Sequence, residues 1–325
     1  MCRNYRNLEV CMVIKPTTVA QYRKILHNLH VRWAREYGWD PLEEPWKQRP
    51  MEFCQWFIDL AASRVWSKRT YWLYRAACLW HFHTVGPIEA AEAIRNTSST
   101  ELPNVGDIPS TSSKKMKKLS GKMLEQLLTR LRNGITGIAT SPIDPFIAQW
   151  LEVGIVTGLR PVEWKDAVFD RNTCTLTVNN AKFDAVRGNG PQRHIIFDRA
   201  DHRDEITKIS QFVANRDYLA AKDGFKALYD KCRKRLWYIC ASLWPNAEVR
   251  PSLYSPRHQF TSNMKKAGLS RAEIAALMGH RSDYTATCHY GRRISGFEVT
   301  PPTTPISEIQ SVGTRRQRKA NPHSS

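Results

Sequence analysis

The chain has 325 residues and a formal net charge of +19, because 49 Lys and Arg stand against 30 Asp and Glu. A basic excess of this size favours a polyanionic partner, and nucleic acid is the leading candidate. No apolar run approaches the roughly 20 residues of a membrane span, and the N-terminus has no signal-peptide core, so we expect no membrane partner.

The sequence offers no recognisable cofactor site. The eight cysteines form no C-x-x-C pair, so neither a zinc site nor a disulfide framework is expected. The chain also has no Walker-type glycine loop and no carboxylate cluster. We therefore expect reduced thiols in a cytoplasmic protein that uses no metal and no other cofactor.

The first folded unit is predicted between residues 15 and 96, after a flexible start at 1–14. Apolar residues recur at helical spacing from Tyr22 to Trp33 and from Phe53 to Leu60, and an aromatic and basic helix covers 66–83. This pattern is typical of a small helical bundle with a charged outer face. Four basic residues near one helix junction are predicted to contact DNA phosphates: Arg64, Lys68, Arg69 and Arg75.

A linker is predicted at residues 97–113, where Ser, Thr and Pro are frequent and apolar periodicity is lost. A group of lysines follows it directly, and the pattern fits a solvated hinge as well as a contact with duplex DNA. These lysines are Lys114, Lys115, Lys117 and Lys118.

The second folded unit is predicted to span 114–299. One helical face runs from Leu124 to Leu131, and a further apolar helix runs from Phe146 to Val156. Arg160 and Glu163 follow, with a proline between them that suits the first turn of a new helix. The two side chains form either a buried structural pair or part of a binding site.

The hydrophobic period then changes from helix to strand. Apolar and polar residues alternate from Cys174 to Val178, and 194–197 supplies a returning strand, which together predict a β-hairpin. Lys182 and Arg187 lie in the polar turn between the strands. A lysine in such a turn is ordinarily solvated.

Helices are predicted again from residue 201 onward. The stretch 201–245 has an expected core of Phe225, Leu228, Tyr229, Leu236 and Trp237. A helix that follows Arg257 is expected to stop at Gly268, and the next opens with a capping box of Ser270 and Glu273. That second helix is expected to stop at Gly279.

Three polar side chains lie at the edges of this helix pair. Arg257 precedes the first helix, His280 follows the second, and Tyr290 comes ten positions after His280. Held together by two packed helices, these side chains could converge on one phosphate. Tyr254 lies three positions before Arg257, and its phenol can donate a hydrogen bond but cannot act as a base near neutral pH.

This motif order resembles the catalytic domain of the tyrosine recombinases, the phage integrase family of site-specific DNA recombinases. The matching residues are the T-G-L-R-P-V-E-W stretch around Arg160, then Arg257, the run 278–280 and Tyr290. Tyr254 occupies the position of the family's first histidine.

The resemblance covers roughly residues 115–295 by motifs and 15–95 by layout alone. It implies a mainly α fold with a small antiparallel β-sheet. In the family's two-domain architecture, a helical core DNA-binding domain precedes a mixed α/β catalytic domain.

The resemblance also implies a role for each matching residue. Tyr290 is the nucleophile, and Arg160 and Arg257 bind the scissile phosphate through fixed, permanently charged guanidiniums. Glu163 supports the arginine of its own box, and Lys182 protonates the leaving 5′-oxygen, with Arg187 as a weaker rival.

His280 adds a donor or helps to remove the phenolic proton, and Tyr254 takes the place of a histidine. Arg292 and Arg293, just after the nucleophile, are expected to contact DNA. Residues 300–325 are expected to form a disordered tail or one that docks on a neighbouring subunit, around 306–309.

The implied function is site-specific DNA recombination through a 3′-phosphotyrosine intermediate and a Holliday junction. We expect it to serve a mobile element, by integration or by cointegrate resolution in transposition. The implied partners are a double-stranded recombination site, three further copies of the chain in a homo-tetramer on two DNA sites, and an accessory DNA-binding protein. The expected location is the cytoplasm, at the nucleoid.

Three alternatives stay open at this point. The stretch 268–280 also resembles the start of a helix-turn-helix, which would make the protein a non-catalytic DNA-binding regulator. A type IB topoisomerase-like enzyme would nick and close DNA with similar chemistry as a monomer. An inactive recombinase is a third reading, because of Tyr254 and of a His280–Tyr290 spacing one residue longer than expected. Tyr284 lies too close to His280 to be favoured as nucleophile.

Overall fold

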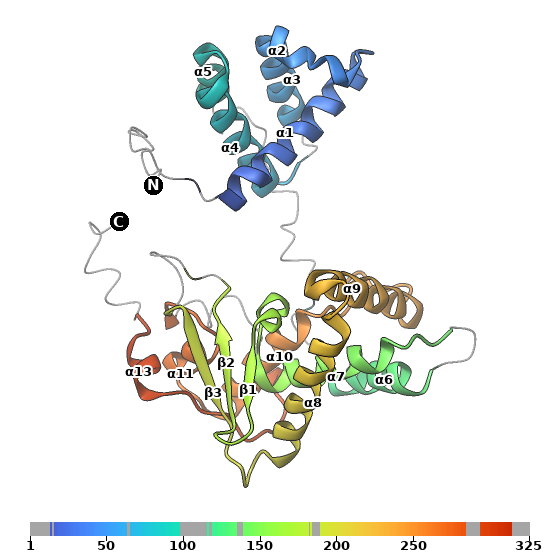
Figure 1. Cartoon of the computed structure of the whole chain (residues 1–325), viewed down its shortest axis with the longest axis vertical. Coiled ribbons are helices and arrows are strands. Elements are labelled where there is room, and N and C mark those ends of the chain that lie inside the picture. Colours follow the sequence, from blue (N-terminus) through green and yellow to red (C-terminus); the bar gives the residue numbers. More distant parts are fainter. Residues whose placement is uncertain are drawn as a thin grey trace. The chain divides into compact units, whose positions relative to one another are not determined.

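The computed structural model describes most of the chain in two compact units, which divide at residues 114 and 115 (Figure 1). Each unit is considered by itself. The described residues are 14, 16–63, 66–97, 116, 119–134, 139–181, 183, 189–283 and 293–313, without the side chains of Lys68 and Arg293.

The first unit is a helical bundle. Its elements are α1 (Pro16–Glu36), the 3-10 turn η1 (Pro41–Glu43), α2 (Pro45–Gln48), α3 (Pro50–Ala62), α4 (Lys68–Val85) and α5 (Ile88–Asn96). The N-terminus of α4 is capped by Ser67, whose hydroxyl accepts a hydrogen bond of 3.2 Å from the Thr70 amide. The aromatic rings of Trp33, Phe53 and Phe82 are buried between the helices, as the helical period predicts.

A histidine is enclosed within this bundle. The ring of His30 on α1 stacks on Trp46 with centroids 4.3 Å apart, and Trp46 meets His81 edge to face at 4.4 Å. Burial, together with the neighbouring imidazoles of His81 and His27, lowers the pKa of His30 to about 3. His30 is therefore neutral in the folded unit at pH values where a free histidine takes up a proton.

The second unit is mainly helical around a small sheet. Its elements are α6 (Gly121–Asn133), α7 (Asp144–Thr157), η3 (Pro161–Lys165), β1 (Val168–Asp170), β2 (Thr175–Asn179), β3 (Gln192–Ile196), α8 (Arg203–Ala220), α9 (Gly224–Leu243), α10 (Ser255–Lys266), α11 (Arg271–Leu277), η4 (Arg293–Ser295) and α13 (Ile306–Gln310). The three strands are antiparallel in the order β1-β2-β3. The expected fold class, mainly α with a small antiparallel sheet, is confirmed.

Helix α7 lies at the centre of the second unit. It is buried on nearly all sides and packs against α6, α8 and α10 (Figure 1). The sheet adds Leu176 of β2 and its partner Ile195 of β3, which are both fully buried in the same core. The rest of the unit packs around this core, including the turns that carry the polar residues considered below.

One expected core residue is on the surface. Helices α8 and α9 confirm the helical prediction for 201–245, but Trp237 is 64% exposed. Its neighbour Leu236 and Cys240, one turn further on, occupy the buried face of α9, so Trp237 points away from it. The prediction extended the buried face one residue too far, because the rotation from Leu236 to Trp237 carries the indole to the solvent side.

The end of the chain is ordered further than expected. We predicted a disordered or subunit-docking tail from residue 300, but 300–313 folds onto its own unit (Figure 1). Ile196 of β3 and Thr303 exchange two backbone hydrogen bonds of 2.9 Å, and Ile309 and Val312 pack against α11. Burial of these two apolar side chains supplies the driving force that the sequence reading overlooked.

Three further hydrogen bonds hold the stretches on either side of 284–292. Before it, the Gly313 amide donates to the carbonyl of Arg281 at 2.8 Å, and the Asp283 amide donates to Gly313 at 3.3 Å. After it, the Gln259 side chain of α10 donates to the carbonyl of Ser295 at 2.6 Å.

Within the described ranges, no helix is both long and apolar enough to cross a membrane.

The enclosed histidine makes the first unit sensitive to acid. In the unfolded chain His30 binds a proton near its ordinary pKa, whereas in the folded unit it does so only near pH 3. The unfolded state thus binds more protons between these values, and stability falls as the pH drops through this window. We expect α1 and α4 to lose hydrogen-exchange protection between pH 7 and pH 4.5 in the full chain.

The variant His30→Met should lose clearly less protection over the same range, because methionine binds no proton. His27→Met is the matched control, since His27 is an exposed residue on the same helix. Equal acid sensitivity of the wild type and His30→Met would contradict the assignment to His30.

Candidate active site

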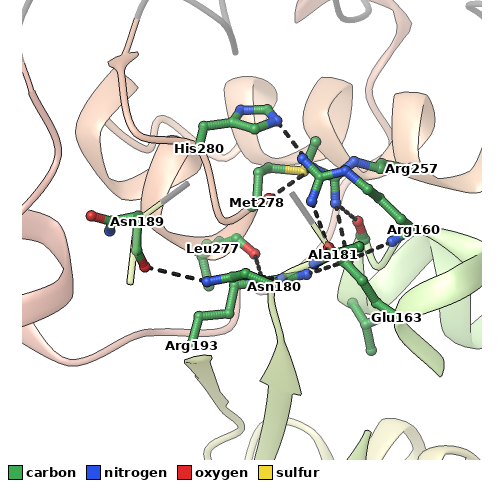
Figure 2. A network of polar contacts seen from close by, with 12 residues as sticks. Arg160, Glu163, Asn180, Ala181, Asn189, Arg193, Arg257, Leu277, Met278 and His280 are labelled. Atoms are coloured by element: carbon green, nitrogen blue, oxygen red, sulfur yellow. Dashed lines mark hydrogen bonds and ion pairs between the residues drawn. The ribbon is translucent and has the colours of Figure 1, made fainter. Parts of the chain in front are cut away.

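A single buried carboxylate, that of Glu163, is shared by three arginines (Figure 2). Glu163 is 3% exposed and accepts a hydrogen bond of 2.8 Å from Arg193. Arg160 donates to its other oxygen, and a nitrogen of Arg257 lies 3.7 Å away. Residues from η3, β3 and α10, far apart in the sequence, therefore meet at one negative charge.

The turn that presents Arg160 depends on Gly158. Gly158 ends α7 with φ +65°, and a Cβ at this position would lie 2.3 Å from the Phe260 ring. Arg160 then takes the N-cap position of η3, and its amide donates to Glu163 at 2.8 Å. The same carboxylate thus holds both the backbone and the side chain of Arg160.

Arg257 connects the turn that follows α7 with the turn that follows α11. Its guanidinium donates to the carbonyl of Gly158 at 2.6 Å and to the carbonyl of Met278 at 2.7 Å. A third contact joins it to Nε2 of His280 at 3.0 Å (Figure 2). The Arg257 side chain has no exposed surface, so a ligand can reach it only after local displacement.

His280 is held by the turn that follows α11. Gly279 takes φ +62°, where a Cβ would lie 2.3 Å from the Asn180 side chain, and the His280 amide donates to Ala275 at 2.8 Å. Burial, together with Arg257, Arg160 and Arg193, holds the pKa of His280 well below its usual range, with Glu163 opposing. An arginine only donates, so Nε2 accepts and the proton of the neutral ring sits on Nδ1.

The cluster carries a net positive charge. Burial alone would raise the pKa of Glu163, but Arg193, Arg257 and Arg160 hold it well below its usual range, so the carboxylate stays ionised. Three guanidiniums and one carboxylate give +2 (3 − 1), and His280 adds none. Arg160, at 6% exposed, and His280, at 5%, form the edge that solvent reaches.

The structure thus brings together four of the predicted site residues: Arg160, Glu163, Arg257 and His280. Tyr254 caps the N-terminus of α10, and its ring meets His258 at a centroid distance of 5.5 Å. The remaining predicted residues of this unit fall outside the described part of the chain or have undescribed side chains. These are Lys115, Lys117, Lys118, Lys182, Arg187, Tyr290, Arg292 and Arg293.

The predicted DNA contacts of the first unit are partly described. Arg69 is exposed on α4, and Arg75 lies over the ring of Trp72 at 5.2 Å and donates to the carbonyl of Arg95 at 2.9 Å. Arg75 is therefore also a structural residue. Arg64, Lys114 and the side chain of Lys68 lie outside the described set.

Arg193 and Asn180 belong to the cluster but were missed in the sequence. Arg193 precedes a predicted strand and shares the inward face with Ile195, because side chains alternate along a strand. A charged residue on a buried face needs a buried partner, and that signal was available. Asn180 carried no comparable signal.

In the described part of this chain, no group of three or more His, Cys, Asp or Glu could hold a metal ion.

The shared carboxylate should be a strong determinant of stability. Glu163→Gln keeps the shape but removes the carboxylate charge that three buried guanidiniums share, so we expect a loss of about 3–5 kcal/mol. Urea unfolding of the full chain measures it. Asp166→Asn, a half-exposed carboxylate near the same turn, should stay within about 0.5 kcal/mol of wild type. Similar effects of the two substitutions would contradict the central role of Glu163.

The neutral state of His280 can be observed directly. We expect the imidazole nitrogen resonances of His280 to report a neutral ring, protonated on Nδ1, at every pH from 8 down to 5.5. The His280→Gln variant identifies the signal by its disappearance. A titration with a midpoint near 6.5, the ordinary value, would show that the arginines do not act on this ring as described.

No family model and no curated protein matches the chain. Similar chains are found among solved structures. The integrase of the Tn1549 transposon, in complex with a circular intermediate DNA, has 13% identity and a TM-score of 0.49, over 82% of this chain and 95% of that one. XerA recombinase has 13% identity and a TM-score of 0.38, over 95% and 93% of the two chains. The integrase of mycobacterium phage Brujita has 14% identity and a TM-score of 0.31, over 93% of both. At this sequence identity and these TM-scores, the activity of this chain has to be inferred from its own side chains.

Proposed function

We propose that this protein is a site-specific DNA recombinase that cuts and rejoins DNA through a covalent bond between Tyr290 and a 3′-phosphate. The observation that supports the proposal is the buried arginine cluster with its net charge of +2. Arg160 and His280 at its edge provide donors for an anion, and Arg257 lies directly behind them.

Guanidiniums fixed around one carboxylate offer directed, charged donors to a further anion at the edge of the cluster. A phosphodiester carries one negative charge, and a second develops on its oxygens when a nucleophile attacks. The charge of the cluster therefore matches the transition state better than the ground state, which is the condition for catalysis. Arginines also keep their charge at any working pH.

The proposed chemical step balances without a cofactor. The phenol oxygen of Tyr290 forms a bond to phosphorus, the bond from phosphorus to the 5′-oxygen breaks, and the phenolic proton passes to water. The ammonium of Lys182 gives its proton to the leaving oxygen. Rejoining is the same step in reverse, with a 5′-hydroxyl as nucleophile, so no oxidant or nucleoside triphosphate is consumed.

The structural state of His280 favours one of its two expected roles. Its Nε2 accepts from Arg257, and its proton lies on Nδ1, so the ring can donate to a phosphate oxygen while it remains neutral. We therefore assign His280 as a donor to the phosphate, and we propose Tyr254 as a further phenol donor.

The wider assembly is proposed from the motif resemblance. A homo-tetramer acts on two DNA sites and exchanges strands through a Holliday junction, with an accessory DNA-binding protein. The reaction serves a mobile element. The net charge of +19 supports a nucleic-acid partner at the nucleoid. In the described part of the first unit, Arg69 offers an exposed cation for backbone contact.

The helix-turn-helix alternative would require a recognition helix after α11, because the second helix of that motif reads the DNA groove. The stretch that would supply it includes 284–292, which lies outside the described part of the chain. Covalent capture on DNA therefore has to separate this alternative from the recombinase proposal.

The first test is covalent capture on a nicked suicide duplex that contains the element's end sequence. Wild type, Tyr290→Phe and Tyr284→Phe are compared on denaturing gels. We expect a protein–DNA band with wild type and Tyr284→Phe, and its loss in Tyr290→Phe, because only a phenol can form the phosphate ester.

If all three proteins shifted DNA on native gels and none formed the band, the catalytic proposal would fail. Relaxation of supercoiled plasmid by monomers, without product exchange between two sites, would indicate the topoisomerase-like alternative.

A further inference from the structure

All three nitrogens of the Arg193 guanidinium are held inside the protein (Figure 2). Its Nε donates to the carbonyl of Leu277 at 2.9 Å, one terminal nitrogen donates to the side-chain oxygen of Asn180, and the other donates to Glu163 at 2.8 Å. The side chain is 1% exposed. Arg193 can therefore act on a ligand of the cluster only through the residues that it holds.

The two oxygens of Glu163 are divided among the surrounding donors. One oxygen accepts from the guanidinium of Arg160 and from the amide of Ala181 at 3.4 Å. The other accepts from the backbone amide of Arg160 and from Arg193, both at 2.8 Å. A nitrogen of Arg257 lies 3.7 Å from this second oxygen, which is beyond hydrogen-bond distance.

Arg193 takes the place at this oxygen that Arg257 would otherwise fill. Two guanidiniums compete for one charged acceptor, and the shorter contact belongs to Arg193. If the donors of Arg193 were lost, the carboxylate would attract Arg257 instead, because charge-assisted hydrogen bonds in a protein interior are strong. Arg257 would then move away from Gly158 and His280, whose contacts now fix its position.

Arg193 also supplies one of the positive charges of the cluster. Without it, two guanidiniums would face one carboxylate, and the net charge would fall from +2 to +1 (2 − 1). A charge acts over several ångströms in a partly buried site, so Arg193 can stabilise an anion that it does not touch. Position and charge therefore indicate the same effect, which is weaker binding of phosphate when Arg193 is replaced.

We propose that Arg193 is a positioning residue of the phosphate site. It holds Glu163 so that Arg160 and Arg257 keep their places for the non-bridging oxygens of the scissile phosphate, and it makes no contact with DNA itself. This inference rests on the proposed function and adds a residue to it. A purely structural arginine at this position would stabilise the fold without any effect that depends on the charge of the phosphate.

The test compares two suicide duplexes that differ only at the scissile phosphate. One carries the ordinary diester, and the other carries a methylphosphonate, in which a methyl group replaces one non-bridging oxygen and removes the negative charge. On the ordinary duplex we expect the full-length Arg193→Met protein to form the covalent complex about 10-fold more slowly than wild type, because one nearby positive charge is lost. On the methylphosphonate duplex its rate should come close to that of wild type.

Two further variants calibrate the result. Arg193→Lys keeps the charge and a donor for Glu163, so it should be slowed less than Arg193→Met on the ordinary duplex. Arg216→Met is the matched control, because Arg216 is a buried arginine of α8 that donates to the carbonyls of Trp164 and Ala167 at 2.6 and 2.7 Å. It removes the same charge from the same unit, and its rate relative to wild type should be equal on the two duplexes.

A second measurement needs no chemical step. Inorganic phosphate is titrated into each protein at constant ionic strength, and its binding is followed through the imidazole resonances of His280 at the edge of the cluster. We expect the dissociation constant to rise about 10-fold in Arg193→Met and to stay near the wild-type value in Arg216→Met.

Equal slowing of Arg193→Met on both duplexes, or unchanged phosphate binding, would make Arg193 a structural residue only and overturn the inference. If Arg193→Met does not fold, Arg193→Gln takes its place, since it keeps an amide donor without the charge, and the same comparison decides. Absence of any covalent complex with wild type on the ordinary duplex would instead contradict the proposed function, and the phosphate titration would then decide the role of Arg193 by itself.

Discussion

The carboxylate of Glu163 is the interaction on which the rest of the second unit depends. It meets guanidiniums from a 3-10 turn, a strand and a helix, and it also caps the turn that carries Arg160. One negative charge shared by three positive ones brings these elements together. The proposed chemistry uses the same guanidiniums, which the shared carboxylate holds in fixed positions.

Close backbone packing makes this arrangement possible. At Gly158 and Gly279 the chain turns with positive φ, and at both positions any side chain would collide with a neighbour that belongs to the site or its support. The neighbour is the ring of Phe260 at Gly158 and the side chain of Asn180 at Gly279. The glycines of the two motifs are thus explained by steric contact, independently of any chemistry.

The parts of the site that could be predicted are those with local signals. Arg160, Arg257 and His280 each lie beside a helix end that a glycine, a proline or a capping box indicates. Arg193 was missed although its inward position on a strand indicated a buried partner, because one sequence does not say on which element that partner, Glu163, lies. The resemblance implied the fold class, and the hydrophobic periods of the predicted helices and hairpin agreed with it. The predictions for Trp237 and for residues 300–313 were wrong. In each case the outcome depends on which side chains meet a neighbouring element in the folded unit, and periodicity does not specify this.

The attachment of the stretches on either side of 284–292 limits the reach of Tyr290, the proposed nucleophile. Asp283 is bound to Gly313, and Ser295 is bound to α10, so both flanking stretches are attached to the second unit. Tyr290 is three residues from Arg293, so its Cα stays within ~11 Å of that residue whatever path the chain takes. A side chain on so short a tether has a high effective concentration at sites within its reach and a negligible one beyond them. Under the proposed function, the tether therefore limits the phosphates that Tyr290 can attack before any base is read.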